Sequence, residues 1–235
     1  MPSNYELSVV IPAYNEAQNI VDLIRDWHQA FVANKIAYQF IIIDDGSVDE
    51  TVNLLKTLQA EMPTVTIHPQ NNKGHGPAIL KGYEIGMQSP WIFQIDADHQ
   101  FETNAFNELW QQRHNYDLLL AEREDKHATL SRNIVSMVTG LIVHLLYGKG
   151  IKDVNSPYRL MRADKLGQAL LKIPSNSFAT NVLITSFFIS TKKRIFTNVV
   201  HFRKNVSLKK SRMNIYFFKG CINSILQVIK FRFSL

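Results

Sequence analysis

Two aspartates separated by one residue, Asp96 and Asp98, are the strongest candidates for chemistry in this sequence. They follow an apolar run at 91–95 that is typical of a buried strand. Where a strand ends, the chain can turn so that both carboxylates reach one cation, and Gln100 offers a third oxygen. Such hard oxygen ligands favour Mg²⁺ or Mn²⁺ shared with substrate phosphates. We therefore predict a metal site at Asp96, Asp98 and Gln100, with a plain exposed acidic turn as the alternative.

Polar residues also follow other apolar runs in the first half of the chain. Asp44 and Asp45 come directly after three isoleucines, where an acid is poorly placed for packing. Gly74, in the loop after the next run, permits the close backbone approach that a diphosphate needs, although a plain loop is an alternative interpretation. The carboxyl ends of parallel strands meet at one edge of a sheet, so these groups are expected to line one crevice.

The elements that position these residues alternate between strand and helix. The expected strands are residues 7–11, 40–43, 65–68, 91–95, 117–121 and 194–202. The expected helices are residues 20–31, 52–58, 77–87, 132–147, 164–171, 181–190 and 214–231, with a loop at 152–162. This order predicts an α/β fold with a doubly wound, mostly parallel sheet, helices on both faces and amphipathic C-terminal helices.

Several enzyme classes are not supported by the motifs of this chain. It has no G-x-x-x-x-G-K-[ST] sequence, and Pro12, Ala13 and Tyr14 follow the first strand where a dinucleotide-binding protein has glycines. A divalent ion on Asp96 and Asp98 would instead act as a Lewis acid on a diphosphate leaving group. The single Cys221 excludes a disulfide framework and fits a reducing compartment.

The charge of the chain is divided unevenly along its 235 residues. Residues 1–164 hold 13 Lys and Arg against all 20 Asp and Glu, whereas residues 165–235 hold 13 Lys and Arg and no acid. The basic end therefore predicts an anionic partner, either a lipid surface or nucleic acid. The longest apolar stretch, 134–147, is shorter than the ~20 residues of a membrane span, and the polar residues 1–6 predict no secretory signal.

Four segments in a fixed order carry a resemblance to a known family. They are VIPAYNE at 10–16, DDGSVDET at 44–51, GHGPA at 74–78 and DADHQ at 96–100. In order and spacing the sequence resembles the family 2 glycosyltransferases of the GT-A fold, and within them the dolichyl- or polyprenyl-phosphate sugar synthases. The resemblance covers residues 7–162 well. It implies a nucleotide-sugar and metal half at 1–125, an acceptor half at 126–212 and a basic amphipathic helix at 213–235.

The resemblance also implies a nucleotide pocket for a GDP- or UDP-linked sugar. Its lining residues would be Pro12, Tyr14, Glu16, Asp44, Asp45, Gly74 and Asp96. Asp44 would accept from a base N–H group, and Asp45 would lie by the ribose or the diphosphate. For Glu16 the alternative is an acid facing a helix dipole, and for Tyr14 a half-buried packing role.

Arg132 and Ser136 are four residues apart, so they share one helical face on which a guanidinium and a hydroxyl can hold a phosphate. By resemblance, Arg123 and Arg203 are further ligands of the acceptor phosphate. Arg123 can instead pair with a neighbouring acid. The segment after Arg203 lacks a glycine that the relatives have, which puts the closing role of that loop in doubt.

The acceptor class decides whether a general base is needed. A lipid monophosphate, with a second pKa near ~6, is already largely an oxyanion at neutral pH, whereas a hydroxyl acceptor must lose a proton. No Asp or Glu follows Asp164. By resemblance, Asp153 matches an acid that precedes an Arg-containing loop in the lipid-phosphate enzymes. The alternative role of Asp153 is that of a turn residue.

We therefore predict a metal-dependent, inverting transfer of a sugar to a polyprenyl phosphate, dolichyl or undecaprenyl. The predicted catalytic residues are Asp96, Asp98, Arg132 and Asp153. The alternative is a family 2 transferase that acts on a glycan or lipid hydroxyl with Asp153 as base. A non-enzymatic protein that binds nucleic acid is the remote alternative. No nucleic-acid partner is expected.

The resemblance and the basic end together predict a cytoplasmic protein held peripherally at the inner face of a membrane, with no transmembrane helix. The helix from 214 is expected to lie in an anionic surface with Leu226 and Phe231 immersed and Lys230 and Arg232 reaching the headgroups. Core packing of this helix is the alternative.

Overall fold

The computed structural model describes residues 4–124, 140–148, 151–201 and 215–234, without the side chains of 123–124 and 215–222. Within these residues a seven-stranded sheet forms the centre of the molecule. Its strands are β1 (Leu7–Ala13), β2 (Tyr38–Asp44), β3 (Val65–Pro69), β4 (Trp91–Gln94), β5 (Leu118–Glu124), β6 (Arg159–Arg162) and β7 (Ile195–His201). Their order across the sheet is β3-β2-β1-β4-β6-β5-β7.

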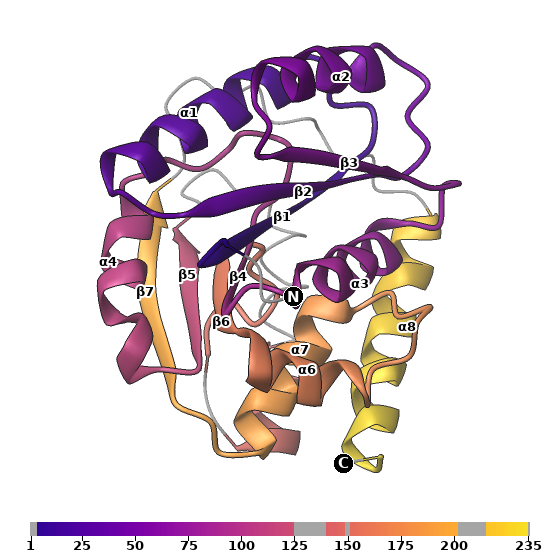
Figure 1. Ribbon diagram of the computed structural model, residues 1–235. Helices are drawn as coiled ribbons and strands as arrows, with labels where there is room; N and C mark the ends of the chain where they lie inside the picture. Colours follow the sequence, from indigo (N-terminus) through magenta and orange to yellow (C-terminus); the bar gives the residue numbers. More distant parts are fainter. Residues whose placement is uncertain (1–3, 125–139, 149–150, 202–214, 235) are drawn as a thin grey trace.

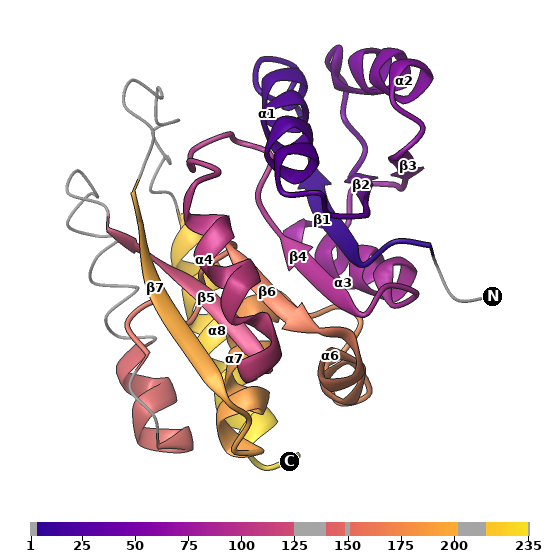
Figure 2. The same ribbon diagram turned by 60° about the vertical axis from the view of Figure 1, so that its left-hand side comes forward.

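Helices cover both faces of this sheet (Figure 1; Figure 2). One face carries α1 (Ile20–Ala33), α2 (Thr51–Glu61) and α4 (Ala105–Gln112). The other carries α3 (His75–Gly86), α6 (Ala163–Leu170), α7 (Thr180–Ser190) and α8 (Ile215–Arg232). A 3-10 turn, η1, follows α4 at Arg113–Asn115, and residues 140–147 are helical. The expected α/β fold with a doubly wound sheet is therefore confirmed.

The structure departs from the expected elements at two places. Residues 159–162, expected to lie in a loop, form β6, which runs antiparallel to both β4 and β5. This strand has only four residues and opens with a charged side chain, so it leaves little alternation in the sequence. Helix α4 was not expected either, and it buries Phe106, Leu109 and Trp110 on one side.

Aromatic packing fills the core beneath α1 and α4. The Trp27 ring lies 5.0 Å from Phe93, 5.7 Å from Phe106 and 5.8 Å from Tyr158, measured between ring centroids. These residues come from α1, β4, α4 and the segment before β6, so the cluster joins both halves of the chain. Strands from before and after residue 125 likewise share one sheet, and the predicted division of roles between the halves stays a prediction.

Helix α8 packs against the opposite face with Val228 and Phe231, which are 1% and 4% exposed. The prediction that Phe231 is immersed in lipid is therefore wrong, because this ring belongs to the protein core. Leu226 is 48% exposed, so the outward side of the helix retains apolar residues. No helix in the described ranges is both long and apolar enough to cross a bilayer.

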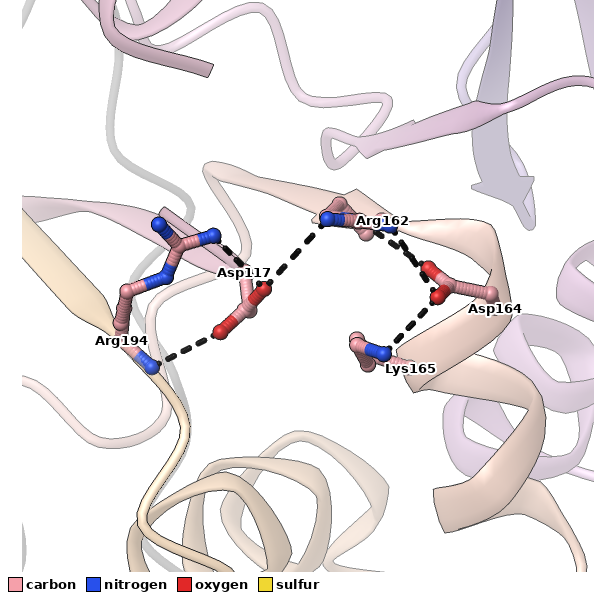
Figure 3. Close-up of polar contacts among 5 residues, drawn as sticks. All are labelled: Asp117, Arg162, Asp164, Lys165 and Arg194. Carbon is pink, nitrogen blue, oxygen red and sulfur yellow. Dashed lines mark hydrogen bonds and ion pairs between the residues drawn. The ribbon is translucent and has the colours of Figure 1, made fainter. Parts of the chain in front are cut away.

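The amino edge of the sheet is held by a network of ion pairs (Figure 3). Asp117, just before β5, accepts hydrogen bonds from the backbone N (2.9 Å) and Nη2 (3.4 Å) of Arg194. Arg162 lies 3.9 Å from Asp117 and also pairs with Asp164 at 3.1 Å. Burial raises the pKa of Asp117, but the bonds from Arg194 and the charge of Arg162 outweigh it and hold that pKa below its usual range.

Candidate nucleotide and metal site

Three loops converge at the carboxyl edge of the sheet. Strand β1 lies between β2 and β4, and the strand order reverses there, because β2 and β3 continue to one side and β4 to the other. The loops after β1, β2 and β4 therefore surround a topological switch point, where open α/β sheets bind their ligands. The predicted nucleotide and metal residues lie at the ends of these strands, in the loops that follow them or in the segment that opens α3.

The loops after β1 and β2 are joined by side chain to backbone hydrogen bonds. The amide N of Asn15 donates to Oγ of Ser47 (3.0 Å), and that of Glu16 donates to Oγ1 of Thr51 (2.9 Å). In return, the amide N of Val48 donates to Oδ1 of Asn15 (2.9 Å). Ser47 and Thr51 thus hold residues 15–16 in place, a role that sequence reasoning missed.

Asp44 and Asp45 are both buried at the end of β2, and they differ in their partners. Asp44 accepts a hydrogen bond from the amide of Ser47 at 3.2 Å. Asp45 accepts three, from Nε2 of Gln70 (2.7 Å) and from the amides of Lys73 (2.9 Å) and Gly74 (2.8 Å). Asp45 therefore fixes the loop that precedes α3, while its predicted contact with ribose or diphosphate stays a prediction.

Glycine is required at two turns of these loops. Gly46 has φ +78°, and a Cβ there would lie 3.0 Å from the amide N of Asn72. Gly74 has φ +92°, which L side chains rarely adopt, and its amide donates to Asp45. The loop after β2 can therefore lie against the loop before α3.

The Asp96 carboxylate meets the first turn of α3. Oδ1 of Asp96 lies 3.0 Å from Nε2 of His75, and the two side chains are 28% and 54% exposed. Partial removal of its ring from water lowers the pKa of His75, but the bond to Asp96 and the charges of Asp96, Asp98 and Asp45 together raise it above its usual value. His75 therefore joins the start of α3 to the loop that carries Asp96, and sequence reasoning treated it only as part of a loop.

The segment after Asp98 is anchored to α1. His99 has φ +55°, and its Nε2 lies 3.1 Å from Oδ2 of Asp26. Asp98 and Gln100, on either side of it, are half-buried. A divalent cation fits this donor set, because carboxylate and amide oxygens are the hard ligands that Mg²⁺ and Mn²⁺ prefer. Among the described residues, there is no group of three or more acidic, His or Cys side chains that could hold a metal ion.

Asp153 lies at the same edge, in the buried segment that leads into β6. Its neighbour Arg159 is fully buried and donates to carbonyl oxygens of Val154, Ser156 and Asn181 at 3.4, 2.5–2.8 and 3.0 Å. A guanidinium surrounded by carbonyl groups thus shapes the segment that carries Asp153 and ties it to α7. In the sequence, Arg159 is the single polar residue in a run of Tyr, Leu and Met, and this was the available signal that its side chain is buried and bonded.

The other predicted residues fall into two groups. Pro12 is buried in β1, Tyr14 is 46% exposed, and the Oε2 of Glu16 accepts a hydrogen bond from Asn19 at 2.7 Å. The predicted acceptor-phosphate ligands lie outside the described part of the molecule: Arg132, Ser136 and Arg203, together with the side chain of Arg123. Their roles stay predictions.

The family model described as glycosyl transferase family 2 matches residues 8–164 of this chain. The chain therefore belongs to family 2 of the glycosyl transferases. It is 27% identical over 212 residues to a putative glycosyltransferase, CsbB, of Bacillus subtilis, which covers 89% of this chain and 63% of that protein. It is 28% identical over 184 residues to an undecaprenyl-phosphate 4-deoxy-4-formamido-L-arabinose transferase of Pseudomonas fluorescens, covering 77% of this chain and 54% of the relative.

Solved structures identify the same fold. The structure of glucosyl-3-phosphoglycerate synthase from Mycobacterium tuberculosis, in complex with Mn²⁺, UDP and glucosyl-3-phosphoglycerate, matches with a TM-score of 0.69 at 14% identity. The match covers 97% of this chain and 80% of that one. The sheet and helices are thus those of the GT-A fold, as expected from the sequence. The chain spans about 63% and 54% of the two curated relatives described above.

Proposed function

We propose that this protein is a metal-dependent glycosyltransferase that moves a sugar from a UDP- or GDP-linked donor to a polyprenyl phosphate, with inversion at the anomeric carbon. The observation that carries the donor half is the position of Asp44, Asp45 and Asp96 at the switch point of the sheet, where Asp96 lies 3.0 Å from His75 at the start of α3. Acids gathered at such an edge suit a nucleotide and a cation together. The Mn²⁺ and UDP in the related synthase complex support this proposal.

Each group would act on a different part of the donor. Asp44 would accept a hydrogen bond from the base, and Tyr14 and Glu16 would border the nucleotide. Asp96 and Asp98, with Gln100, would hold Mg²⁺ or Mn²⁺. That ion, when bound, supplies Lewis-acid stabilisation of the departing diphosphate. A Cβ placed on Gly74 would meet no atom within 4 Å, so this side of the glycine has room for a phosphate at the start of α3.

The acceptor half rests on the undecaprenyl-phosphate transferase among the relatives and on the chemistry of a lipid phosphate. Such a phosphate attacks as an oxyanion and needs no base. Arg132, Arg123, Ser136 and Arg203 would hold and orient it. Asp153 would border the sugar or orient an arginine, and in the alternative with a hydroxyl acceptor it would be the base.

A product assay tests this function. The purified chain is offered labelled UDP- and GDP-sugars with undecaprenyl phosphate, or with undecaprenol as the hydroxyl acceptor, in Mg²⁺ or Mn²⁺. We expect a lipid-phosphate sugar from undecaprenyl phosphate alone, and its loss in Asp98→Asn and with a chelator. Exposed Glu84→Gln is the control and should behave as the unmodified chain. Transfer to undecaprenol instead would overturn the acceptor assignment, and Asp153→Asn should then abolish it.

We also propose that the protein works at the cytoplasmic face of a membrane without crossing it. The basic excess of residues 165–235 supports this location, because an anionic leaflet attracts such a segment. A polyprenyl acceptor is itself confined to a bilayer. Binding to anionic vesicles that weakens as salt is raised would be the expected behaviour.

A further inference from the structure

Helix α8 is distant in sequence from the motifs of the candidate nucleotide and metal site, yet one of its side chains reaches the start of α7. Oε1 of Gln227 accepts hydrogen bonds from the backbone amides of Phe178 and Ala179, both at 3.1 Å. The hydroxyl of Ser177 donates to the same oxygen at 3.5 Å. A single amide oxygen of α8 therefore holds residues 177–179, which we call the turn before α7.

The turn before α7 relies on this outside acceptor. Ala179 is the N-cap residue of α7 and has no polar side chain with which to cap the helix. The amide of Ser177 donates to the carbonyl oxygen of Pro174 at 3.0 Å, and Oγ1 of Thr180 donates to that of Ser177 at 3.2 Å. The next two amides of the turn are the ones that donate to Gln227. Loss of that acceptor would leave both amides without it and would loosen the turn.

The turn before α7 lies directly against the first turn of α3. A Cβ placed on Gly76 would lie 1.9 Å from the carbonyl oxygen of Ser177 and 2.9 Å from Oγ1 of Thr180. No side chain fits in this space, so the two backbones touch. Helix α7 packs against both α3 and α8, and the three helices cover the same face of the sheet (Figure 1). The position of the turn therefore sets the position of the start of α3, at the carboxyl edge of the sheet.

The first turn of α3 also carries the partner of a predicted metal ligand. His75 precedes Gly76, and its Nε2 lies 3.0 Å from Oδ1 of Asp96. A shift of the α3 backbone would carry the imidazole with it. Since a hydrogen bond weakens steeply as its angle and length depart from the ideal, a small shift would be enough to loosen the hold on Asp96. A series of direct contacts thus runs from α8 to the Asp96 carboxylate.

We propose that Gln227 is a positioning residue for the metal end of the candidate site. It holds the turn before α7 against the first turn of α3, and this contact keeps the imidazole of His75 on the carboxylate of Asp96. Gln227 itself would touch neither the nucleotide nor the cation. The inference rests on the proposed function for the role of Asp96 in metal binding, and it makes α8 a part of the support of a site whose motifs all lie before residue 101.

Titration of the full chain with Mn²⁺ in the presence of UDP or GDP tests this role, with free Mn²⁺ measured by electron paramagnetic resonance. Gln227→Leu keeps most of the side-chain volume and removes the acceptor, so it should weaken Mn²⁺ binding about threefold. Gln227→Glu retains acceptor oxygens for the two amides and should restore the affinity. Unchanged Mn²⁺ binding in Gln227→Leu would overturn the proposal.

The neighbouring residue provides the matched control. Val228 is 1% exposed, so Val228→Ala loosens the buried side of α8 and leaves the amide oxygen of Gln227 in place. This variant should bind Mn²⁺ as the unmodified chain does, even where it unfolds more easily. An equal loss of Mn²⁺ affinity in Val228→Ala and Gln227→Leu would show that Gln227 serves only the stability of the helix, and would refute the positioning role.

A double variant shows whether Gln227 acts through His75. In the His75→Ala background the bond to Asp96 is already lost, so the further change Gln227→Leu should have little effect on Mn²⁺ binding. Fully additive losses would mean that the two residues act independently, and the proposed route through the start of α3 would be wrong.

Hydrogen exchange without nucleotide or metal separates this link from the proposed function. The amide of Ala78, which donates to the carbonyl oxygen of Gly74 at 3.2 Å, reports on the first turn of α3. It should exchange about threefold faster in Gln227→Leu and at the ordinary rate in Val228→Ala. If the unmodified chain binds no Mn²⁺ with either nucleotide, the proposed metal site fails, while faster exchange at this amide upholds the link from Gln227 to the start of α3. Unchanged exchange there would overturn the link.

Discussion

His75 and Asp96 join the first turn of α3 to the loop after β4, with 3.0 Å between Nε2 of the imidazole and Oδ1 of the carboxylate. Asp96 is a proposed metal ligand, so His75 would act as the outer partner that orients it. Outer partners of this kind change metal affinity without touching the ion. The two residues are 21 positions apart in the sequence, and only the packing of α3 against β1 and β2 brings them together.

We expect His75→Ala to weaken Mn²⁺ binding about tenfold in the presence of UDP or GDP, because Asp96 loses the donor that orients it. His75→Gln retains an N–H donor and should recover part of the affinity. The measurement is free Mn²⁺ by electron paramagnetic resonance during titration. The exposed His144→Ala serves as control. Unchanged or tighter Mn²⁺ binding in His75→Ala would contradict the orienting role.

Asp45→Ala should lower the free energy of unfolding by about 2–3 kcal/mol, since it removes a buried acceptor of three hydrogen bonds and leaves the amides of Lys73 and Gly74 without it. Urea denaturation measures the loss. Removal of the exposed carboxylate of Glu84 by Glu84→Ala should change stability by less than about 0.5 kcal/mol. A fully stable Asp45→Ala would show that the loop before α3 is held by other contacts.

Arg159→Met should be among the most destabilising single changes, by about 3–5 kcal/mol, because the buried carbonyl group of Ser156 loses two guanidinium donors and those of Val154 and Asn181 lose one each. Arg159→Lys keeps the charge but cannot reach all three carbonyl groups. Its stability should therefore lie between that of the unmodified chain and that of Arg159→Met. Thermal unfolding gives the order of the variants. The exposed Arg25, which pairs with Glu61 at 3.3 Å, is the comparison, and Arg25→Met should cost less than about 1 kcal/mol. Similar losses at Arg159 and Arg25 would refute this account.

Asp117 should make stability depend on acid pH. Its pKa in the folded chain is below its usual value, so its contribution is complete above the ordinary Asp pKa of about 3.9 and is lost as pH falls through the folded value. Asp117→Asn should therefore be less stable near neutral pH and should lose less stability on acidification. Unfolding free energies of both chains from neutral pH down to about pH 3 measure this difference. Parallel curves would show that Asp117 does not titrate with folding.

The sequence by itself determined the order of most strands and helices, although β6 and α4 were not expected, and it placed the predicted metal and nucleotide motifs at strand ends. Strand and helix periodicities are local, and so is the rule that places Asp44, Asp45, Asp96 and Asp98 at strand ends. The family likewise follows from short segments that each lie at the end of one strand or the start of one helix. For this reason the fold and the predicted crevice residues follow from the order of the residues alone.

Tertiary structure decided which distant groups meet. The bonds of Ser47 and Thr51 to residues 15–16 cross more than 30 positions, and the antiparallel β6 depends on pairing with both β4 and β5. On α8, apolar residues occur on several sides, so periodicity could not tell that Phe231 is buried while Leu226 is exposed. The periodicity of apolar residues indicates the direction of a side chain around its own helix. The packing of the whole chain decides which surface that side chain meets.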